Sequence, residues 1–466
     1  MPDQPNFIVF MTDQQRGDCL SADGHPCLLT PVMDSIGGGG TRFRRAYTTC
    51  PSCVPARRSF LSGQSPFNNQ MVGMTASPWE PPTTMPRELA KAGYQTAIVG
   101  RVMHQYRPDG HYGFEYVSED YDAYLDDNQP NGGGGQKGHG IPANGWTARP
   151  WHLDEHLHHT HWVVNEALRF LENRDTTRPF FLCVSFVAPH PPLTPPAFYM
   201  DRYLRQDLPG PYIGDWAAPP ANGGFGLDIE RPAVDLRGEA FRSCAAGYFG
   251  LINHVDDQMY RVIDVLKRGR AQFGDTVTMH CSDHGEMLGD HYHFRKTFAY
   301  EASARVPLLI SPPASYGFPT HQVSEHPVCL EDVMPTVLDF AGCDIPENVD
   351  GQSLLPILKG EECPDVRAVL HGEHARCYDD IYNNHYLIDG REKFIWLSHT
   401  GQELLFDIQE DPNEMRNLAA LDENAARVAR WRDRMIDQLK DRPEGFVDSG
   451  RLVAGKTHVP IPPAVN

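Results

Sequence analysis

Short apolar runs alternate with amphipathic stretches along most of this chain. Five of the runs are rich in β-branched or aromatic residues, which is typical of buried strands in a parallel sheet. Helical patterns lie between them, as over 162–173 and over 248–269, where Lys267, Arg268 and Gly269 form a C-terminal stop. The alternation predicts an α/β fold with a large, mostly parallel central sheet sandwiched by helices. The predicted strands are 6–11, 96–100, 180–186, 276–281 and 306–310.

The pattern changes after residues 350–365. Three short strand-like pieces follow, and then a helix is predicted at about 422–440. We therefore expect two domains, a catalytic α/β domain over 1–365 and a smaller domain over 366–466. The second should be an antiparallel sheet packed with a helix.

Two long irregular segments interrupt the larger domain, at 107–150 and at 187–237. The first contains a glycine-rich stretch and the second is rich in proline. Long loops in a compact domain often form lids or substrate walls, although plain surface loops are an equal alternative.

Composition narrows the classes of partner. The 466 residues include 41 Lys and Arg against 61 Asp and Glu, a formal net charge of −20. Such a balance argues against nucleic acid or an anionic membrane as the main partner, but a local basic pocket could still bind a small anion. The N-terminus has no leader pattern, and no apolar run is long enough for a membrane helix. We interpret the eleven scattered cysteines mostly as reduced thiols. Together with the N-terminal sequence, they predict a cytoplasmic protein.

Polar side chains follow four of the predicted strands. The carboxyl ends of parallel strands meet at one edge of a sheet, where open α/β sheets bind their ligands. Two acidic strand ends with an imidazole offer ligands for a hard divalent cation. Taken singly, each residue has a simpler interpretation, such as a helix cap at Asp13 or a packed histidine at His190. The strand-end residues are Asp13, Gln14, Arg101, His104, His190, Asp283 and His284.

Cys53 lies in "TTCPSCVPARRSFLSG", residues 48–63. A helix is predicted to begin just after it, with Pro55 near the first helical position. A group at this helix end meets backbone N–H donors and a positive dipole, and Arg57 adds a charge one turn on, so an anionic nucleophile is favoured there. The C-x-x-C pair with Cys50 could instead belong to a zinc or redox site, but the chain lacks a second ligand pair of suitable spacing.

At this point the chain resembles the sulfatase family, whose fold is alkaline-phosphatase-like. Cys53 to Arg57 matches the core motif C-x-P-x-R, and "GYQTAIVGRVMH" (93–104) is similar to the second family signature, with Arg101 where lysine is usual. Residues 5–16 resemble the first metal-binding strand, and 281–310 resemble the second metal segment with the lysine that follows it. Later landmarks at 350–360 and 403–419 keep the family order, so the resemblance spans nearly the whole chain.

The resemblance implies roles for individual residues. Cys53 would be oxidised to formylglycine after translation and, with four strand-end residues, would hold one divalent cation, most readily Ca²⁺, with Mn²⁺ or Mg²⁺ as alternatives. Arg57 would anchor residue 53 and His104 would act as its base. Arg101, His190 and Lys296 would contact the sulfate group, and His190 or Lys296 would assist the leaving oxygen. The implied metal ligands are Asp13, Gln14, Asp283, His284 and residue 53.

The implied activity is that of an arylsulfatase-like sulfuric ester hydrolase. It would cleave the S–O bond of a small anionic aryl or carbohydrate sulfate ester, releasing sulfate and an alcohol or phenol. Hydrolysis of phosphonate or phosphate esters by the same site is the alternative, and a zinc or redox protein using C-x-x-C is a more distant one. A formylglycine-generating enzyme is an implied partner, and the state of assembly is open, with a homo-oligomer as one option.

The histidine-rich run "HLHHTHW" (156–162) precedes a predicted helix. A second metal site is one interpretation, since His158 and Trp162 flank one helical turn. We favour a capped helix start whose histidines face substrate or solvent. His158 is therefore a candidate substrate-binding residue at the edge of an insertion.

Overall fold

The larger sheet of the protein has eight strands, in the order β5-β4-β6-β1-β7-β8-β2-β9. In this computed structural model the described residues are 4–75, 77–101, 111–118, 120–221, 230–269, 273–361, 367–376 and 378–463. The central strands β4, β6, β1 and β7 run parallel to one another, as predicted. The strands are β1 Asn6–Asp13, β2 Thr41–Phe43, β4 Gln95–Gly100, β5 Tyr116–Val117, β6 Phe180–Pro189, β7 Thr276–Ser282, β8 Leu308–Ser311 and β9 Gln322–Ser324.

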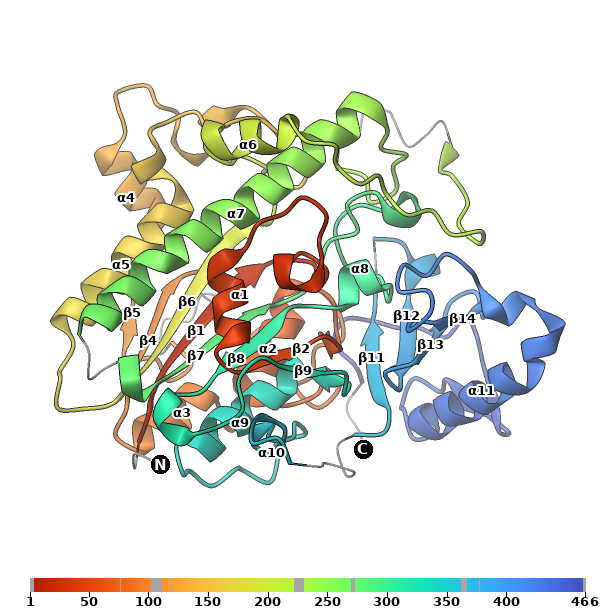
Figure 1. The fold of residues 1–466 in the computed structure, drawn as a ribbon. Coiled ribbons are helices and arrows are strands. Elements are labelled where there is room, and N and C mark those ends of the chain that lie inside the picture. Colours follow the sequence, from red (N-terminus) through yellow and green to blue (C-terminus); the bar gives the residue numbers. More distant parts are fainter. Residues whose placement is uncertain are drawn as a thin grey trace.

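Helices cover both faces of this sheet (Figure 1). Along β1, Ile8 and Phe10 pack against one helical layer, whereas Phe7, Val9 and Met11 pack against the other. A strand buried on both faces needs apolar residues at every position, which explains its continuous apolar run. The first layer contains α1 Pro31–Gly38, α4 Tyr121–Asn128, α5 His159–Asn173, α6 Ala197–Leu204 and α7 Gly238–Arg268; the second contains α2 Cys53–Ser62, α3 Met85–Lys91, α9 Val333–Phe340 and α10 Leu355–Leu358.

Two predictions about these elements were wrong. The strand β8 pairs antiparallel with β7, so it is not one of the parallel strands. Helix α7 begins at Gly238, ten residues before the predicted start. Gly247, directly before the predicted start, obscured the helical pattern because it reads as a breaker, whereas Gly250 lies inside the predicted range. They are small because the helix passes close to the loop around Leu193 and Pro195, and an added Cβ at Gly250 would lie 3.1 Å from Pro195.

The smaller sheet is antiparallel, as predicted, with the order β11-β12-β13-β14. The helix α11 packs on it through Trp431, Met435 and Leu439, which bury the apolar side chains Phe394 and Trp396. Figure 1 shows this unit, in blue, beside the larger sheet. The strands are β11 Leu370–His374, β12 Asn384–Ile388, β13 Glu392–Leu397 and β14 Glu403–Asp407, and the helix spans Ala425–Leu439; the two-stranded pairs are β3 Ala46–Tyr47 with β10 Val328–Cys329 and β15 Val447–Asp448 with β16 Arg451–Leu452.

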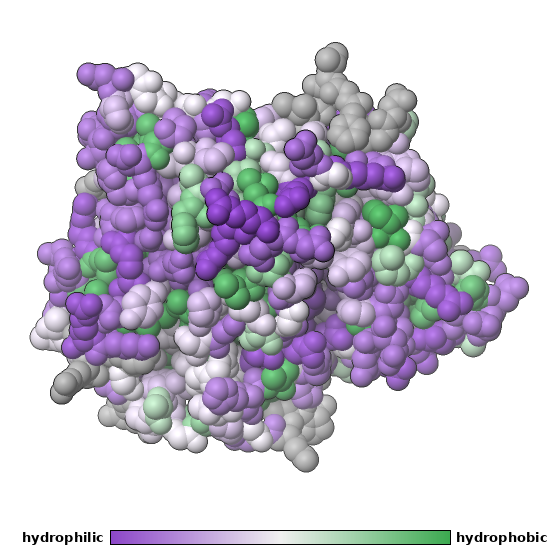
Figure 2. Space-filling model, turned by 45° about the horizontal axis from the view of Figure 1, so that its top comes forward, coloured by the Kyte–Doolittle hydropathy of each residue, from purple (hydrophilic) through white to green (hydrophobic). Residues whose placement is uncertain are grey.

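Apolar residues are scattered over the face that comes into view when the top of the molecule in Figure 1 is turned forward. Figure 2 shows hydrophilic residues over most of this face, with apolar ones in small separate patches. Within the described residues, every helix is either too short or too polar to cross a lipid bilayer.

A buried ion-pair cluster joins the two sheets. The ammonium of Lys393, on β13, lies 2.8 Å from Glu301, on the short helix α8 (Glu301–Ala304), and 3.0 Å from Glu414. All three side chains are buried. Burial, and then the neighbouring charge of Glu301, raise the pKa of Glu414 to about 7, although Lys393 opposes this shift. The smaller sheet is therefore held to the rest of the protein by charge as well as by apolar packing.

We predict that Lys393→Met lowers the free energy of unfolding by about 3–5 kcal/mol at pH 7.5, because the buried Glu414 loses the cation paired with it and Glu301 keeps only its arginine partners. The loss should be smaller at pH 5.5. A carboxyl group whose pKa is higher in the folded than in the unfolded state takes up a proton on folding, so lower pH stabilises the variant. Denaturant unfolding at both pH values tests this. Lys440→Met removes an exposed lysine paired with Asp437 and serves as the control; equal losses for the two variants would contradict the prediction.

Candidate active site

The ends of β1 and β7 bring two carboxylates together. These strands pair in parallel with Thr12 opposite Ser282, so the next residues, Asp13 and Asp283, leave the sheet side by side. Both side chains are fully buried. The chain then turns sharply at Gln14, whose φ of 73° lies in the left-handed region, and its backbone N–H donates to Asp283 at 3.1 Å.

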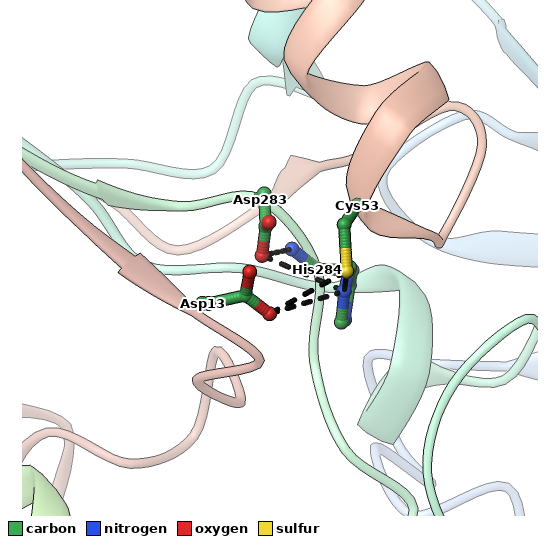
Figure 3. Close-up of side chains that lie close together, drawn as sticks. All are labelled: Asp13, Cys53, Asp283 and His284. Atoms are coloured by element: carbon green, nitrogen blue, oxygen red, sulfur yellow. Dashed lines mark hydrogen bonds and ion pairs between the residues drawn. The ribbon is translucent and has the colours of Figure 1, made fainter. Parts of the chain in front are cut away.

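Cys53 is the first residue of α2, and its side chain reaches the same point from the opposite side (Figure 3). Its Sγ lies 3.6 Å from Asp13 Oδ1 and 3.2 Å from His284 Nε2. The Nζ of Lys296 donates to this sulfur at 3.2 Å. The predicted helix N-terminus therefore presents residue 53 to a cluster of acidic, basic and imidazole groups.

The two carboxylates divide their oxygens between arginine and the cluster. Arg57 donates to Oδ2 of Asp283 at 2.8 Å and to Oδ2 of Asp13 at 3.2 Å. Arg101 also pairs with Oδ2 of Asp13, at 3.0 Å. The two Oδ1 atoms each lie 3.6 Å from Nε2 of His284. Each aspartate is thus held by arginine on one oxygen and offers the other to the centre of the site.

This donor set fits a divalent cation. One ligand atom from each of Asp13, Cys53, Asp283 and His284 lies within 4.8 Å of all the others, and all four residues are buried. Two carboxylate oxygens and an imidazole nitrogen are ligands of divalent ions. The argument from shared strand ends predicted that Asp13, Asp283 and His284 would lie together. Cys53 was expected at the start of a helix, and its place beside the metal was implied by the resemblance.

Burial and neighbouring charges together set the protonation of two groups here. The pKa of His284 is lowered, first by burial and also by the charge of Lys296, against the opposing effect of Asp283. A neutral imidazole is the form that binds a metal. Burial alone would lower the pKa of Arg57, but Asp283 and Asp13 raise it above its ordinary value, so the guanidinium stays charged.

Gln14 is oriented by Glu286, a contact that the sequence reasoning missed. The Gln14 amide donates through Nε2 to the Glu286 carboxylate, which leaves Oε1 to accept from Lys296 at 2.9 Å. Glu286 also accepts from the backbone N–H of Leu288 at 2.8 Å. The position of Glu286 in the sequence, three residues after Asp283, matches no pattern that would have predicted its contact with Gln14.

Ser185, near the end of β6, was also missed. Its Oγ accepts from Arg57 at 2.8 Å, and the carbonyl of Arg101 accepts from the same guanidinium at 3.2 Å. Together with the two aspartates, these contacts give the Arg57 side chain four hydrogen-bond acceptors, which fix its position. The apolar pattern of the strand 180–186 concealed the single hydroxyl.

His190 follows β6 and is partly buried. Its Nδ1 donates to the carbonyl of Pro191 at 2.6 Å, which leaves Nε2 available to another partner. Burial and the charge of Lys296 lower the pKa of His190, so the ring is neutral at pH 7 in the substrate-free protein. The charges of Lys296, Asp13 and Arg101 all act on its pKa, so the ring lies within electrostatic range of the cluster. His104 lies outside the described residues.

His158 caps the helix α5, as the favoured interpretation of the histidine-rich run predicted. Its Nδ1 accepts from the backbone N–H of Thr160 at 3.1 Å, and its Nε2 donates to the carbonyl of Thr194 at 3.2 Å. Both ring nitrogens therefore have protein partners. Its contact with substrate stays a prediction.

The fold and this cluster define a metal-assisted hydrolase of the alkaline-phosphatase-like class. The family model described as Sulfatase matches residues 5–343, and the one described as N-sulphoglucosamine sulphohydrolase, C-terminal, matches 289–441. The chain therefore belongs to the sulfatase family, and it is a sulfuric ester hydrolase.

Similar proteins extend over nearly the full chain. An arylsulfatase of Clostridium perfringens is 37% identical over 97% of this chain and 98% of the relative. A multifunctional alkaline phosphatase superfamily protein, PehA, of Trinickia caryophylli is 28% identical over 95% of this chain and 98% of its own. The crystal structure of a phosphonate monoester hydrolase of Agrobacterium radiobacter has a TM-score of 0.79 at 25% identity, covering 93% of this chain and 95% of that one.

We predict that Glu286→Gln weakens divalent-cation binding by about 10- to 100-fold, since groups that orient metal ligands typically contribute this much. The new amide would confront the Gln14 amide with a donor, and Gln14 would turn its oxygen away from the site. Titration calorimetry with Ca²⁺ and Mn²⁺ on the folded protein measures the change.

Asp290→Asn is the control for this test. It also removes a buried carboxylate from the same segment, but that carboxylate pairs with Arg16. If both variants bind the cations as tightly as the unaltered protein, or lose affinity equally, Glu286 does not orient Gln14 for the site.

Proposed function

We propose that the protein hydrolyses sulfate monoesters at the S–O bond, with residue 53 in its formylglycine form as the nucleophile. The observation that carries the proposal is the position of Cys53. It begins a helix, it lies among the metal-ligand donors, and a lysine ammonium contacts its sulfur. The sulfur stands in for the oxygen substituents that formylglycine carries on the same carbon.

Formylglycine, once hydrated, supplies two hydroxyl groups on one carbon, one to attack sulfur and one to lose a proton so that sulfate is expelled. The chain's own groups favour this chemistry at position 53. The N-terminus of α2 stabilises negative charge on the attacking oxygen, and Lys296 adds a positive charge at contact distance. We assign the base for the second hydroxyl to His104, on the resemblance alone.

We propose one divalent cation at Asp13, Gln14, Asp283, His284 and residue 53, with Ca²⁺ first and Mn²⁺ or Mg²⁺ as alternatives. Such an ion lowers the pKa of a bound hydroxyl and offsets charge on the transferring group. Four oxygen donors favour calcium, whereas the imidazole of His284 favours manganese. The order of affinities in the titration described above distinguishes them.

Three cations surround the place where the sulfate group would lie. Arg57 and Arg101 share the buried aspartates, so their side chains are held in fixed directions. Lys296 donates to Gln14 and Cys53 rather than to a carboxylate, and its charge is therefore the one most available to a substrate oxygen. Fixed cations around a transferring group stabilise the charge that develops there.

His190 and Lys296 are the proposed donors to the leaving oxygen. Since His190 is neutral in the substrate-free protein, Lys296 supplies the proton or the charge first. A bound anion would raise the pKa of His190 and allow its Nε2 to donate as well.

A second candidate is hydrolysis of phosphonate or phosphate esters by the same residues. The likeness to a phosphonate monoester hydrolase and to PehA favours it, and so does the pair Gln14 and His284. A sulfate monoester and a phosphonate monoester both carry one negative charge, so the same set of cations would suit either. The family match and the relation to an arylsulfatase give the sulfate ester preference.

Several broader assignments remain proposals. They are the division into 1–365 and 366–466, a cytoplasmic location, and a maturation enzyme that oxidises Cys53. The nine cysteines among the described residues are free of disulfides, which agrees with a reducing compartment. The boundary near 365 agrees with the start of the smaller sheet at Leu370.

We predict that Cys53→Ser abolishes multiple turnover. A serine has a single hydroxyl, so it could accept the sulfuryl group but could not expel sulfate by losing a second proton. With an aryl sulfate, this variant should release at most one phenol per active site. Intact-mass analysis should then find either the unmodified serine or its sulfate ester.

Cys50→Ser is the matched control, because it removes the other buried thiol of the pair while leaving position 53 unchanged. This control should retain turnover and a formylglycine residue at 53. Sustained turnover by Cys53→Ser would contradict the formylglycine role.

A further inference from the structure

A small pocket adjoins the candidate active site. We propose that it holds the leaving group of the ester and that it selects an uncharged aromatic alcohol over a charged one. The proposal rests on the proposed function, because it assumes that ester cleavage takes place at residue 53. The residues that carry the argument are Tyr121, Trp151, His158, His159, His190 and Thr160, all of which line the pocket.

The pocket and the catalytic cluster share His190. This ring lines the pocket and also interacts electrostatically with Lys296 and Asp13. Arg101 connects them as well, since it pairs with Asp13 at 3.0 Å and its charge acts on His159. A sulfate group at residue 53 with His190 at its leaving oxygen would therefore direct the alcohol towards this pocket.

The lining is electrically neutral. Among the described residues that form it there is no aspartate, glutamate, lysine or arginine. Its four histidines are neutral at pH 7: burial lowers the pKa of His139, His158 and His190, and it lowers that of His159 to about 3. The pocket thus contrasts with the charged cluster beside it, and a ligand that fits both has an anionic head and an uncharged body.

Six of the thirteen described residues that line the pocket carry aromatic rings. Tyr121 meets His159 edge-on at 4.8 Å between ring centroids, and Trp151 meets His158 in the same way at 5.3 Å. A further aromatic ring would extend this edge-to-face packing, which contributes about 0.5–1.5 kcal/mol per pair beyond burial. The wall therefore favours a flat ring.

Besides His190 Nε2 and the amide of Gln136, three buried polar atoms of the lining are open to a ligand. Trp151 Nε1, His159 Nδ1 and Thr160 Oγ1 are buried and have no hydrogen-bond partner within the described part of the chain. They could satisfy one or two polar groups on a phenol. A sugar presents more hydroxyl groups than these atoms can match, and each buried group left unpaired costs about 1–3 kcal/mol.

A charged substituent would be excluded more strongly. A carboxylate on the leaving ring would lose its water and meet no cation among the described residues of the lining, and burial of an unpaired charge is costly. We therefore expect kcat/KM for 4-carbamoylphenyl sulfate to exceed that for 4-carboxyphenyl sulfate by at least about tenfold in the matured enzyme. The two substrates have nearly the same shape, so the charge is the main difference.

The variant His159→Lys tests whether the pocket causes this preference. A lysine there supplies the missing cation, so the preference for the amide should shrink at least about tenfold or invert. For each variant, the ratio of the kcat/KM values of the two sulfates is compared with the same ratio for the unaltered enzyme. Differences in leaving-group chemistry therefore cancel. His156→Lys, in the same run but exposed and outside the lining, controls for the overall field and should leave the ratio unchanged.

A second measurement requires no variant. The phenols 4-hydroxybenzamide and 4-hydroxybenzoate are the two products, and the amide should inhibit the unaltered enzyme at least about tenfold more strongly. Equal inhibition, a wild-type substrate ratio near one, or equal effects of the two lysine variants would overturn the proposal. A neutral monosaccharide sulfate cleaved better than phenyl sulfate would overturn the aromatic preference.

Failure of the proposed function would look different. In that case neither sulfate would be cleaved, while aryl phosphonates would be turned over. The matched pair of carbamoyl- and carboxy-substituted aryl phosphonates would then test the pocket independently.

Discussion

The site depends on one buried interaction, the bridge that Arg57 makes between Asp13 and Asp283. The guanidinium is almost completely buried, and it contacts both carboxylates at 2.8 and 3.2 Å. Two carboxylates this close would otherwise repel one another in a site of low polarity. By neutralising them, Arg57 allows two parallel strands to end in acidic residues at the same place.

Other features follow from this bridge. Because each aspartate uses Oδ2 for arginine, its Oδ1 is directed towards His284 and residue 53. Since Arg57 lies one turn into α2, the same contact fixes the helix whose first residue is Cys53. The position of the nucleophile, the geometry of the metal ligands and the register of the strand ends are thus coupled through one side chain.

Sequence patterns predicted the parts of this structure that depend on periodicity and on chain direction. The continuous apolar run at 6–11 identified a central strand, and the polar residues after it identified the site. Patterns could not predict features that depend on contact between distant segments. The antiparallel direction of β8, the close passage of α7 at Gly250 and the contact of Glu286 with Gln14 all arise only when the chain is folded. The neutral pocket was missed for the same reason, because its lining comes from residues as distant as Tyr121 and Leu251.

The preference between sulfate and phosphonate tests the account most directly. With formylglycine at residue 53 verified by peptide mass, kcat/KM should be measured side by side for 4-nitrophenyl sulfate and 4-nitrophenyl phenylphosphonate, which carry the same leaving group. The account predicts the higher value for the sulfate, with inorganic sulfate released in equal amount to the phenol. A higher value for the phosphonate, or cleavage of the sulfate at the C–O bond, would contradict it.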